Sequence, residues 1–150
     1  MTITTHEIGN HAITRATFRD AVGRTCKVES IWPHGPCEDR LWLGIAPNMM
    51  ANLDRFRAWA IAGYLRFALD TRRNVPRGQI ADVLERVFVF KVAVRGGEWR
   101  VVMGEKGQSA KMEIDETTAE SVAKVLDAYW NGAPADDTVR MMVKEARDGE

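Results

Sequence analysis

Two adjacent glycines, Gly96 and Gly97, separate two runs of alternating residues in the stretch FKVAVRGGEWRVVM at 90–103. Glycine adopts the positive φ angles that a two-residue turn requires, so this stretch predicts an antiparallel hairpin of fixed register. In that register Arg95 pairs with Glu98. One face is then wholly apolar, comprising Phe90, Val92, Val94, Trp99, Val101 and Met103. The other face comprises Lys91, Ala93, Arg95, Glu98 and Arg100, so the hairpin provides a core surface rather than a reactive site.

Further strands flank a long central segment. Residues 25–32 and 40–46 favour two strands, since the prolines and glycine of the loop PHGPCED at 33–39 cannot continue a sheet. Residues 110–114 favour a strand after the hairpin, with Met112 and Ile114 facing inward. We therefore expect one antiparallel sheet of about five strands.

Helical patterns fill the remainder. The longest helix is predicted over 47–73, and a shorter one over 77–87 on the spacing of its apolar residues. Thr117 and Glu120 fit a capping box for a third helix, and Asp136 or Asp137 fits the cap of a fourth. The prediction is a single α+β domain over 1–150, with 47–87 as a helical insertion between strands and no internal repeat. The sheet packs against the long central helix and the two C-terminal helices.

Composition supports a globular protein. The chain has 150 residues, of which 45% are hydrophobic and 28% charged. It has no apolar run near the roughly 20 residues of a membrane span, and its N-terminus lacks the pattern of a secretion signal. Its two cysteines are too few for a secreted disulfide scaffold. These features predict a cytoplasmic protein that does not contact membranes.

The long helix carries three arginines on its narrow polar side. On a helical wheel Arg55, Arg66 and Arg73 fall close together, while apolar residues cover most of the remaining circumference. The arginines form either the helix's solvent edge or a contact surface for an anion or an acidic partner. A helix so apolar is buried either by its own sheet and neighbours or by a second copy of the chain, as in a homodimer.

Trp32 and His34 lie at the edge of the 33–39 loop. Trp32 either anchors a protein partner, because tryptophan is frequent among interface hot spots, or covers the end of a sheet. The predicted binding residues are therefore Trp32, His34, Arg55, Arg66 and Arg73.

Catalytic and metal sites have little support. Cys26, His34 and Cys37 lack the second ligand pair of a structural zinc site. Cys37 with His34 is the only nucleophile and base pair worth naming, and the acidic Glu38 and Asp39 oppose a reactive thiolate. No phosphate-binding glycine motif is present. We predict no catalytic residues, no metal and no cofactor, and a hydrolase or metal enzyme using His34 and Cys37 is a minor alternative.

Charge is unevenly distributed along a chain of zero net charge. Residues 51–104 have ten basic and five acidic side chains, whereas residues 105–150 have six basic and eleven acidic ones. Either the basic segment binds nucleic acid, or the acidic C-terminal part neutralises it within the fold.

The chain resembles small bacterial and phage proteins that have an F-x-D-x-x-G-x-x-C start, here Phe18, Asp20, Gly23 and Cys26. The resemblance continues with LWLG at 41–44 and with KMEID leading into ETTAESVAKVLDAYWNG, and it covers about the first and last 45 residues. It implies a bacterial or phage origin and assigns no activity.

The sequence therefore predicts a non-enzymatic protein-binding module that acts through its surface and has a protein partner. One concrete form is a phage inhibitor of a host defence complex. The alternative is a nucleic-acid-binding protein that uses the basic segment 51–104.

Overall fold

The computed structural model describes the whole chain except residues 1, 9–10, 34–39, 131–141, 145 and 149–150, and it describes side chains within 15–29, 41–126, 142–144 and 146–148. The fold is α+β, as predicted, with antiparallel sheets. Within the described residues, no helix combines the length and apolar character needed to cross a membrane.

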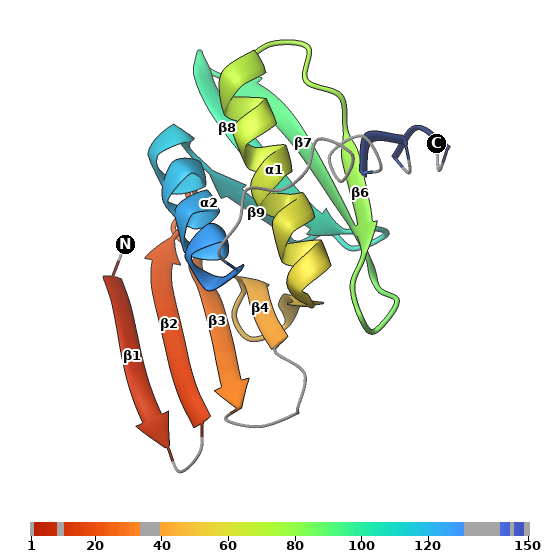
Figure 1. The fold of residues 1–150 in the computed structure, drawn as a ribbon. Helices are drawn as coiled ribbons and strands as arrows, with labels where there is room; N and C mark the ends of the chain where they lie inside the picture. Colours follow the sequence, from red (N-terminus) through yellow and green to blue (C-terminus); the bar gives the residue numbers. More distant parts are fainter. Residues whose placement is uncertain (1, 9–10, 34–39, 131–141, 145, 149–150) are drawn as a thin grey trace.

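The strands form two sheets rather than the single predicted sheet (Figure 1). The first sheet contains β1 (Thr2–Ile8), β2 (His11–Arg19), β3 (Thr25–Pro33), β4 (Arg40–Ile45) and β5 (Met49–Leu53) in sequence order. The second contains β6 (Gly78–Ala81), β7 (Val87–Arg95), β8 (Glu98–Glu105) and β9 (Lys111–Ile114) in sequence order. Helix α1 (Arg55–Thr71) follows the first sheet, and α2 (Glu116–Trp130) follows the second.

The predicted hairpin is confirmed as β7 and β8. Arg95 pairs with Glu98 and Phe90 with Met103, as the two-glycine turn requires. Phe90 and Met103 are buried, whereas Val94 beside the turn is 61% exposed. The hairpin therefore buries its predicted apolar face except at its tip.

The long helix is shorter than predicted. It begins at Arg55, after Asp54, whose carboxylate accepts a hydrogen bond from the backbone N–H of Arg57 at 2.8 Å. Residues 47–53 instead make a turn and β5, an element that the sequence pattern did not reveal. Met49 and Leu53 of this strand are buried, so the apolar pattern there is that of a strand with one buried face.

The helix predicted over 77–87 is wrong. Its residues form β6 and the turn before β7. Ile80 is buried on β6, while Leu84 in the turn is 62% exposed. Residues 47–87 thus contain strands as well as a helix. The helical spacing of apolar residues at 77–87 arises by chance from one strand and one turn.

Both long helices lie on one side of the strands, in front of them in Figure 1. α1 packs against α2 and also reaches the second sheet, where the Tyr64 ring centroid lies 5.8 Å from that of Phe90. The Tyr64 hydroxyl donates to the carbonyl oxygen of Pro76 at 2.7 Å. One hydrophobic core joins the helices to both sheets. The side of the sheets that faces away from this core is here called the outer face.

The turn between β2 and β3 is organised by Asp20. Its Oδ1 accepts hydrogen bonds from the backbone N–H groups of Val22 and Arg24 at 3.1 and 2.8 Å. Its Oδ2 accepts one from the backbone N–H of Glu113 in β9, at 3.1 Å. The backbone N–H of Ala21 donates to the carbonyl of Glu113 at 2.7 Å. The first sheet's turn therefore caps the edge of the second sheet's last strand.

The turn between β6 and β7 repeats this arrangement. Oδ1 of Asp82 accepts from the backbone N–H groups of Leu84 and Arg86, both at 2.9 Å. Its Oδ2 accepts from the backbone N–H of Asn52 in β5 at 3.0 Å. The backbone N–H of Val83 donates to the carbonyl of Asn52 at 3.0 Å. Each turn thus holds the last strand of the other sheet.

The chain therefore contains an internal repeat, whereas the sequence analysis predicted none. The first half (11–71) and the second half (78–130) each consist of a four-stranded meander and a helix, and equivalent residues are offset by 60 to 62 positions. Asp115, the counterpart of Asp54, accepts from the backbone N–H of Thr118 at 2.8 Å, so it caps α2 where a capping box at Thr117 was predicted. β1 extends the first sheet beyond the repeat.

Candidate functional site

A hollow of about 310 Å³ opens on the outer face of the second sheet. Its rim carries four positively charged side chains, those of Arg77, Lys91, Lys106 and Lys111. These residues come from the entry to β6, from β7, from the turn after β8 and from β9. We call this site the cationic hollow.

Strand alternation places these cations on the outer face. Phe88 and Phe90 face the core, so Lys91 points outward; Met112 is buried, so the neighbouring Lys111 also points outward. Lys106 follows β8, where its backbone N–H donates to the carbonyl of Val87 at 2.7 Å. The sequence order of a meander thus gathers separate cations at one place.

Gly104 makes room for Lys111. The two residues pair across β8 and β9, and a Cβ atom added at Gly104 would lie 2.6 Å from Cδ of Lys111. The lysine stem therefore occupies the space that a side chain at 104 would fill. Nζ of Lys111 would lie 3.1 Å from the same added Cβ atom, so the ammonium group lies over Gly104, and Lys111 lines the hollow.

The described residues that line the cationic hollow include four cations and no carboxylate. Two carboxylates elsewhere on this sheet have arginine partners. Glu113 pairs with Arg95 at 3.0 Å, and Glu98 forms a short ion pair with Arg100. Four positively charged side chains around one depression are suited to hold an anion.

The first sheet has a hollow of about 410 Å³ on the same outer face. Its lining includes Lys27, Trp42, Met50 and Arg86. Trp42 is half-buried, so it is held by the sheet while part of its ring system remains accessible. Glu29, which also lines this hollow, forms an ion pair with Arg15 at 2.6 Å. We call this site the tryptophan hollow.

The arginines predicted from the sequence do not form one site. Arg55 begins α1 and Arg66 lies eleven residues later, about 16 Å along the helix axis. Arg73 lies beyond the helix, which ends at Thr71. Arg66 lines a separate hollow between the two helices, together with Asp70, Glu120 and Lys124. The predicted row is thus a series of separated positions.

The two remaining predicted site residues lie at the limit of the described chain. Trp32 belongs to β3, and its side chain lies outside the described residues, as does the whole of His34. Cys37 also lies outside them. The pairing of His34 with Cys37 therefore stays a prediction.

Among the residues that the structure describes, no group of three or more His, Cys, Asp or Glu side chains could hold a metal ion. Cys26 is a buried free thiol. Burial raises its pKa to about 12, and the negative charge of Asp20 adds to the shift. A thiol of this kind is protonated at neutral pH and is a poor nucleophile.

Sequence reasoning missed the cationic hollow because it assigned 77–87 to a helix. The hairpin register alone placed Lys91 on the polar face. With β6 assigned correctly, Arg77 and Lys111 join it on the same side. The strand signal was the pair of alternating positions Gln79 and Ile80, too short to outweigh a helical spacing.

Comparison of the chain with models of protein families found no match, and comparisons with curated proteins and with solved structures found none either.

Proposed function

We propose that this chain is a non-enzymatic binding protein and that its ligand is nucleic acid, bound by its phosphates on the outer face. The observation that carries the proposal is the cationic hollow, where Arg77, Lys91, Lys106 and Lys111 meet around one depression. Phosphate contacts by lysine and arginine supply most of the affinity of proteins for nucleic acid. The hollow lies within the basic part of the chain and at its boundary with the acidic part.

The sheet surface of the outer face also fits this ligand. A sheet surface can contact several nucleotides at once, whereas a small metabolite needs a deep enclosed site. Neither of the two described hollows on the outer face is an enclosed cavity. This geometry supports an extended ligand that lies across the strands.

Fluorescence anisotropy with a labelled single-stranded oligonucleotide tests the proposal. The wild-type protein binds at 50 mM salt and weakens as salt rises. Replacing both Lys91 and Lys111 by glutamine weakens binding about fivefold or more. It also lowers the slope of log affinity against log salt by about 1.4, since each lost contact to a single strand contributes about 0.7.

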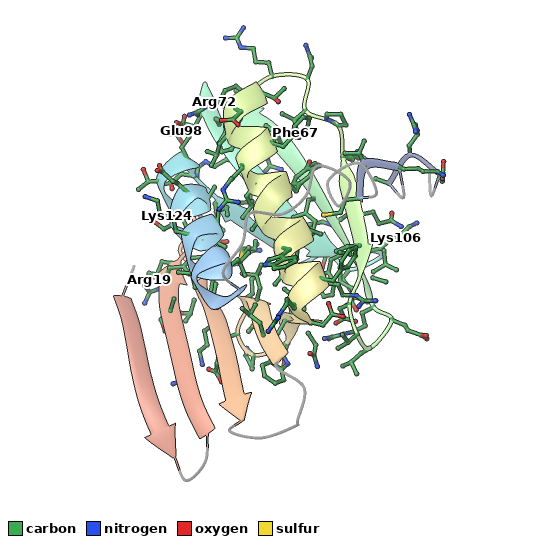
Figure 2. All side chains as sticks on the ribbon, viewed as in Figure 1. Arg19, Phe67, Arg72, Glu98, Lys106 and Lys124 are labelled. Atoms are coloured by element: carbon green, nitrogen blue, oxygen red, sulfur yellow. The ribbon has the colours of Figure 1, made fainter. Side chains whose placement is uncertain are left out.

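Lys124→Gln is the matched control. It removes one positive charge, as Lys91→Gln does, from the exposed surface of α2. Figure 2 shows Lys124 and Lys106 on opposite sides of the molecule. Absence of binding at 50 mM salt would overturn the proposal, as would equal loss in Lys91→Gln and Lys124→Gln. Polyglutamate that competes as well as the oligonucleotide at equal charge would indicate an acidic protein as the ligand instead.

A protein-binding module remains a second proposal, supported by one observation. Val22 and Leu84 occupy equivalent positions in the two Asp-centred turns, and they are 55% and 62% exposed. Exposed apolar side chains at matched positions suit a partner that contacts both turns. Loss of co-purification in the double variant Val22→Ser, Leu84→Ser tests it, and recovery of the same partner by that variant would contradict it.

A further inference from the structure

The tryptophan hollow occupies the place in the first half that the cationic hollow occupies in the second. The backbone bonds of the Asp20 and Asp82 turns make Asn52 the counterpart of Glu113. In the registers of the two sheets, Trp42 pairs with Asn52 and Val102 pairs with Glu113. Trp42 is therefore the counterpart of Val102, which lines the cationic hollow.

Equivalent glycines in the two halves contribute to the two hollows. Gly44 and Gly104 are equivalent residues on the outer face, and each lies between two strands that border its hollow. Neither glycine projects a side chain there. The repeat therefore produces a depression at the same place in each half, and the residues around it decide what it binds.

The linings of the two hollows have different chemistry. Of the four cations of the cationic hollow, Lys91, Lys106 and Lys111 correspond to Glu29, Ala46 and Met50 in the first half. The tryptophan hollow has instead an aromatic ring, and Lys27 is a cation at its edge. One hollow suits phosphate and the other suits a flat apolar group beside a phosphate.

We propose that the tryptophan hollow is a base-stacking subsite, in which Trp42 stacks on a base of the same single-stranded nucleic acid whose phosphates occupy the cationic hollow. This inference rests on the proposed function. Stacking on an aromatic side chain requires an unpaired base, so the ligand is single-stranded.

Charge in the tryptophan hollow agrees with this role. The guanidinium group of Arg86 is engaged by the buried carboxylate of Asp82 at 3.0 Å and by the carbonyl of Met50 at 2.5 Å. Glu29 is paired with Arg15. Lys27 is the described lining cation for which no such partner is seen, and it supplies one positive charge beside the ring, where a stacked nucleotide carries its phosphate.

The two hollows are close enough for one single-stranded nucleic acid to reach both. Arg86 lines the tryptophan hollow, and Val89 of the following strand lines the cationic hollow. Three residues of β-strand span about 10 Å. Aromatic and cationic sites on a surface of this size match single-strand binding sites of at least about four nucleotides.

The test compares two ligands of equal backbone charge, a 12-nucleotide oligothymidine and an abasic oligonucleotide of the same length. Trp42→Ala weakens binding of the oligothymidine about 5-fold to 100-fold, the range expected for one lost stacking contact. It leaves binding of the abasic ligand within about twofold, because the phosphate contacts persist. Trp42→Phe retains most of the affinity for oligothymidine.

Phe56→Ala is the matched control, since Phe56 is an aromatic residue 45% exposed on α1. It changes neither affinity. Retained binding of the abasic ligand also shows that the Trp42→Ala protein is folded, and if Trp42→Ala does not fold, the comparison of the two ligands with Trp42→Phe and wild-type protein decides.

The possible failures are distinguishable. Equal affinity of the wild-type protein for the two ligands, or equal loss of both in Trp42→Ala, overturns the stacking subsite and leaves the phosphate site standing. Absence of wild-type binding to either ligand overturns the proposed function itself. Tighter binding to a duplex than to the single strand also contradicts the subsite.

Discussion

The carboxylate of Asp20 accepts a hydrogen bond at 3.1 Å from the backbone N–H of Glu113, 93 residues further along the chain. Asp82 makes the corresponding bond to Asn52 at 3.0 Å. Each aspartate also accepts two backbone bonds within its own turn. One side chain in each half therefore fixes a turn and attaches it to the other half.

Replacing these aspartates should destabilise the protein unequally. Asp82→Ala leaves backbone donors without their acceptor and the guanidinium group of Arg86 without its ion-pair partner, and we expect the free energy of unfolding to fall by about 3 to 5 kcal/mol. Asp20→Ala removes only backbone bonds, so a loss of about 2 to 3 kcal/mol is expected. Urea unfolding monitored by tryptophan fluorescence measures both.

The exposed Asp70 on α1 serves as the control, since Asp70→Ala should change the free energy of unfolding by about 0.5 kcal/mol or less. A larger loss in Asp20→Ala than in Asp82→Ala would show that the arginine pair adds nothing at the second turn.

The equivalent glycines should respond differently to alanine. A Cβ at Gly44 would lie 2.0 Å from the carbonyl oxygen of Met49, and its φ of 149° is unfavourable for other residues. We expect Gly44→Ala to lower the free energy of unfolding by about 2 to 4 kcal/mol. At Gly104 the obstacle is mainly the flexible stem of Lys111, so Gly104→Ala should cost about 1 kcal/mol or less.

Gly104→Ala should nevertheless weaken oligonucleotide binding, because it displaces Lys111 from the cationic hollow. Thermal unfolding together with fluorescence anisotropy measures the two effects separately. Equal destabilisation by the two alanines would contradict the difference in backbone geometry.

The hairpin shows what a sequence pattern can establish. Turn chemistry and apolar alternation both specify the pairing of Arg95 with Glu98, and the structure has that register. The first and last residues of β3 and β4 are close to the predicted ones. Met112 and Ile114 of β9 are buried, as expected. Local signals were sufficient where two of them agreed.

Features that depend on contacts between distant parts of the chain could not be predicted from such local patterns. The turn at 82–86 depends on the hydrogen bond that Asp82 accepts from the backbone N–H of Asn52, thirty residues earlier, and its apolar spacing imitates that of a helix. The repeat was missed because the halves share few residues, such as Asp20 with Asp82 and Gly44 with Gly104. The cationic hollow requires the sheet order before its members can be recognised as neighbours.

The Cys26 thiol should make stability fall at alkaline pH. Burial raises its pKa from 9.0 to about 12, so the thiol ionises in the unfolded chain first and favours unfolding between pH 9 and 12. The contribution is fully present below pH 9 and is lost as pH rises toward 12. Between pH 8 and 10 the wild-type protein should lose about 1.4 kcal/mol more than Cys26→Ala.

Thiol reactivity provides a second measurement. In a Cys37→Ser background, the native protein at pH 8 should react slowly with a thiol reagent and rapidly after denaturation. Parallel pH profiles of the wild-type and Cys26→Ala proteins, or rapid native labelling, would contradict burial of this thiol.

The C-terminal end of α1 should depend on Trp99. Its indole N–H donates to the carbonyl of Arg72 at 3.0 Å, and the Arg72 guanidinium lies 5.3 Å from the ring centroid. Trp99→Phe keeps the ring and loses the hydrogen bond, so the free energy of unfolding should fall by about 1 kcal/mol. Trp99→Ala loses both and should cost about 3 kcal/mol or more. Calorimetry checks the order: no loss of stability in Trp99→Phe would exclude a role for the indole N–H, and equal losses in the two variants would exclude a contribution from the aromatic ring.

The reciprocal contacts between each turn and the last strand of the other sheet have a consequence for how the two halves can differ. A single half could satisfy every one of these contacts by associating with an identical copy, giving a symmetrical pair with two equal depressions. Joining the copies into one polypeptide frees each depression to change without altering the other. An asymmetric ligand, with unlike groups along its length, then becomes accessible to a scaffold built from two equivalent halves.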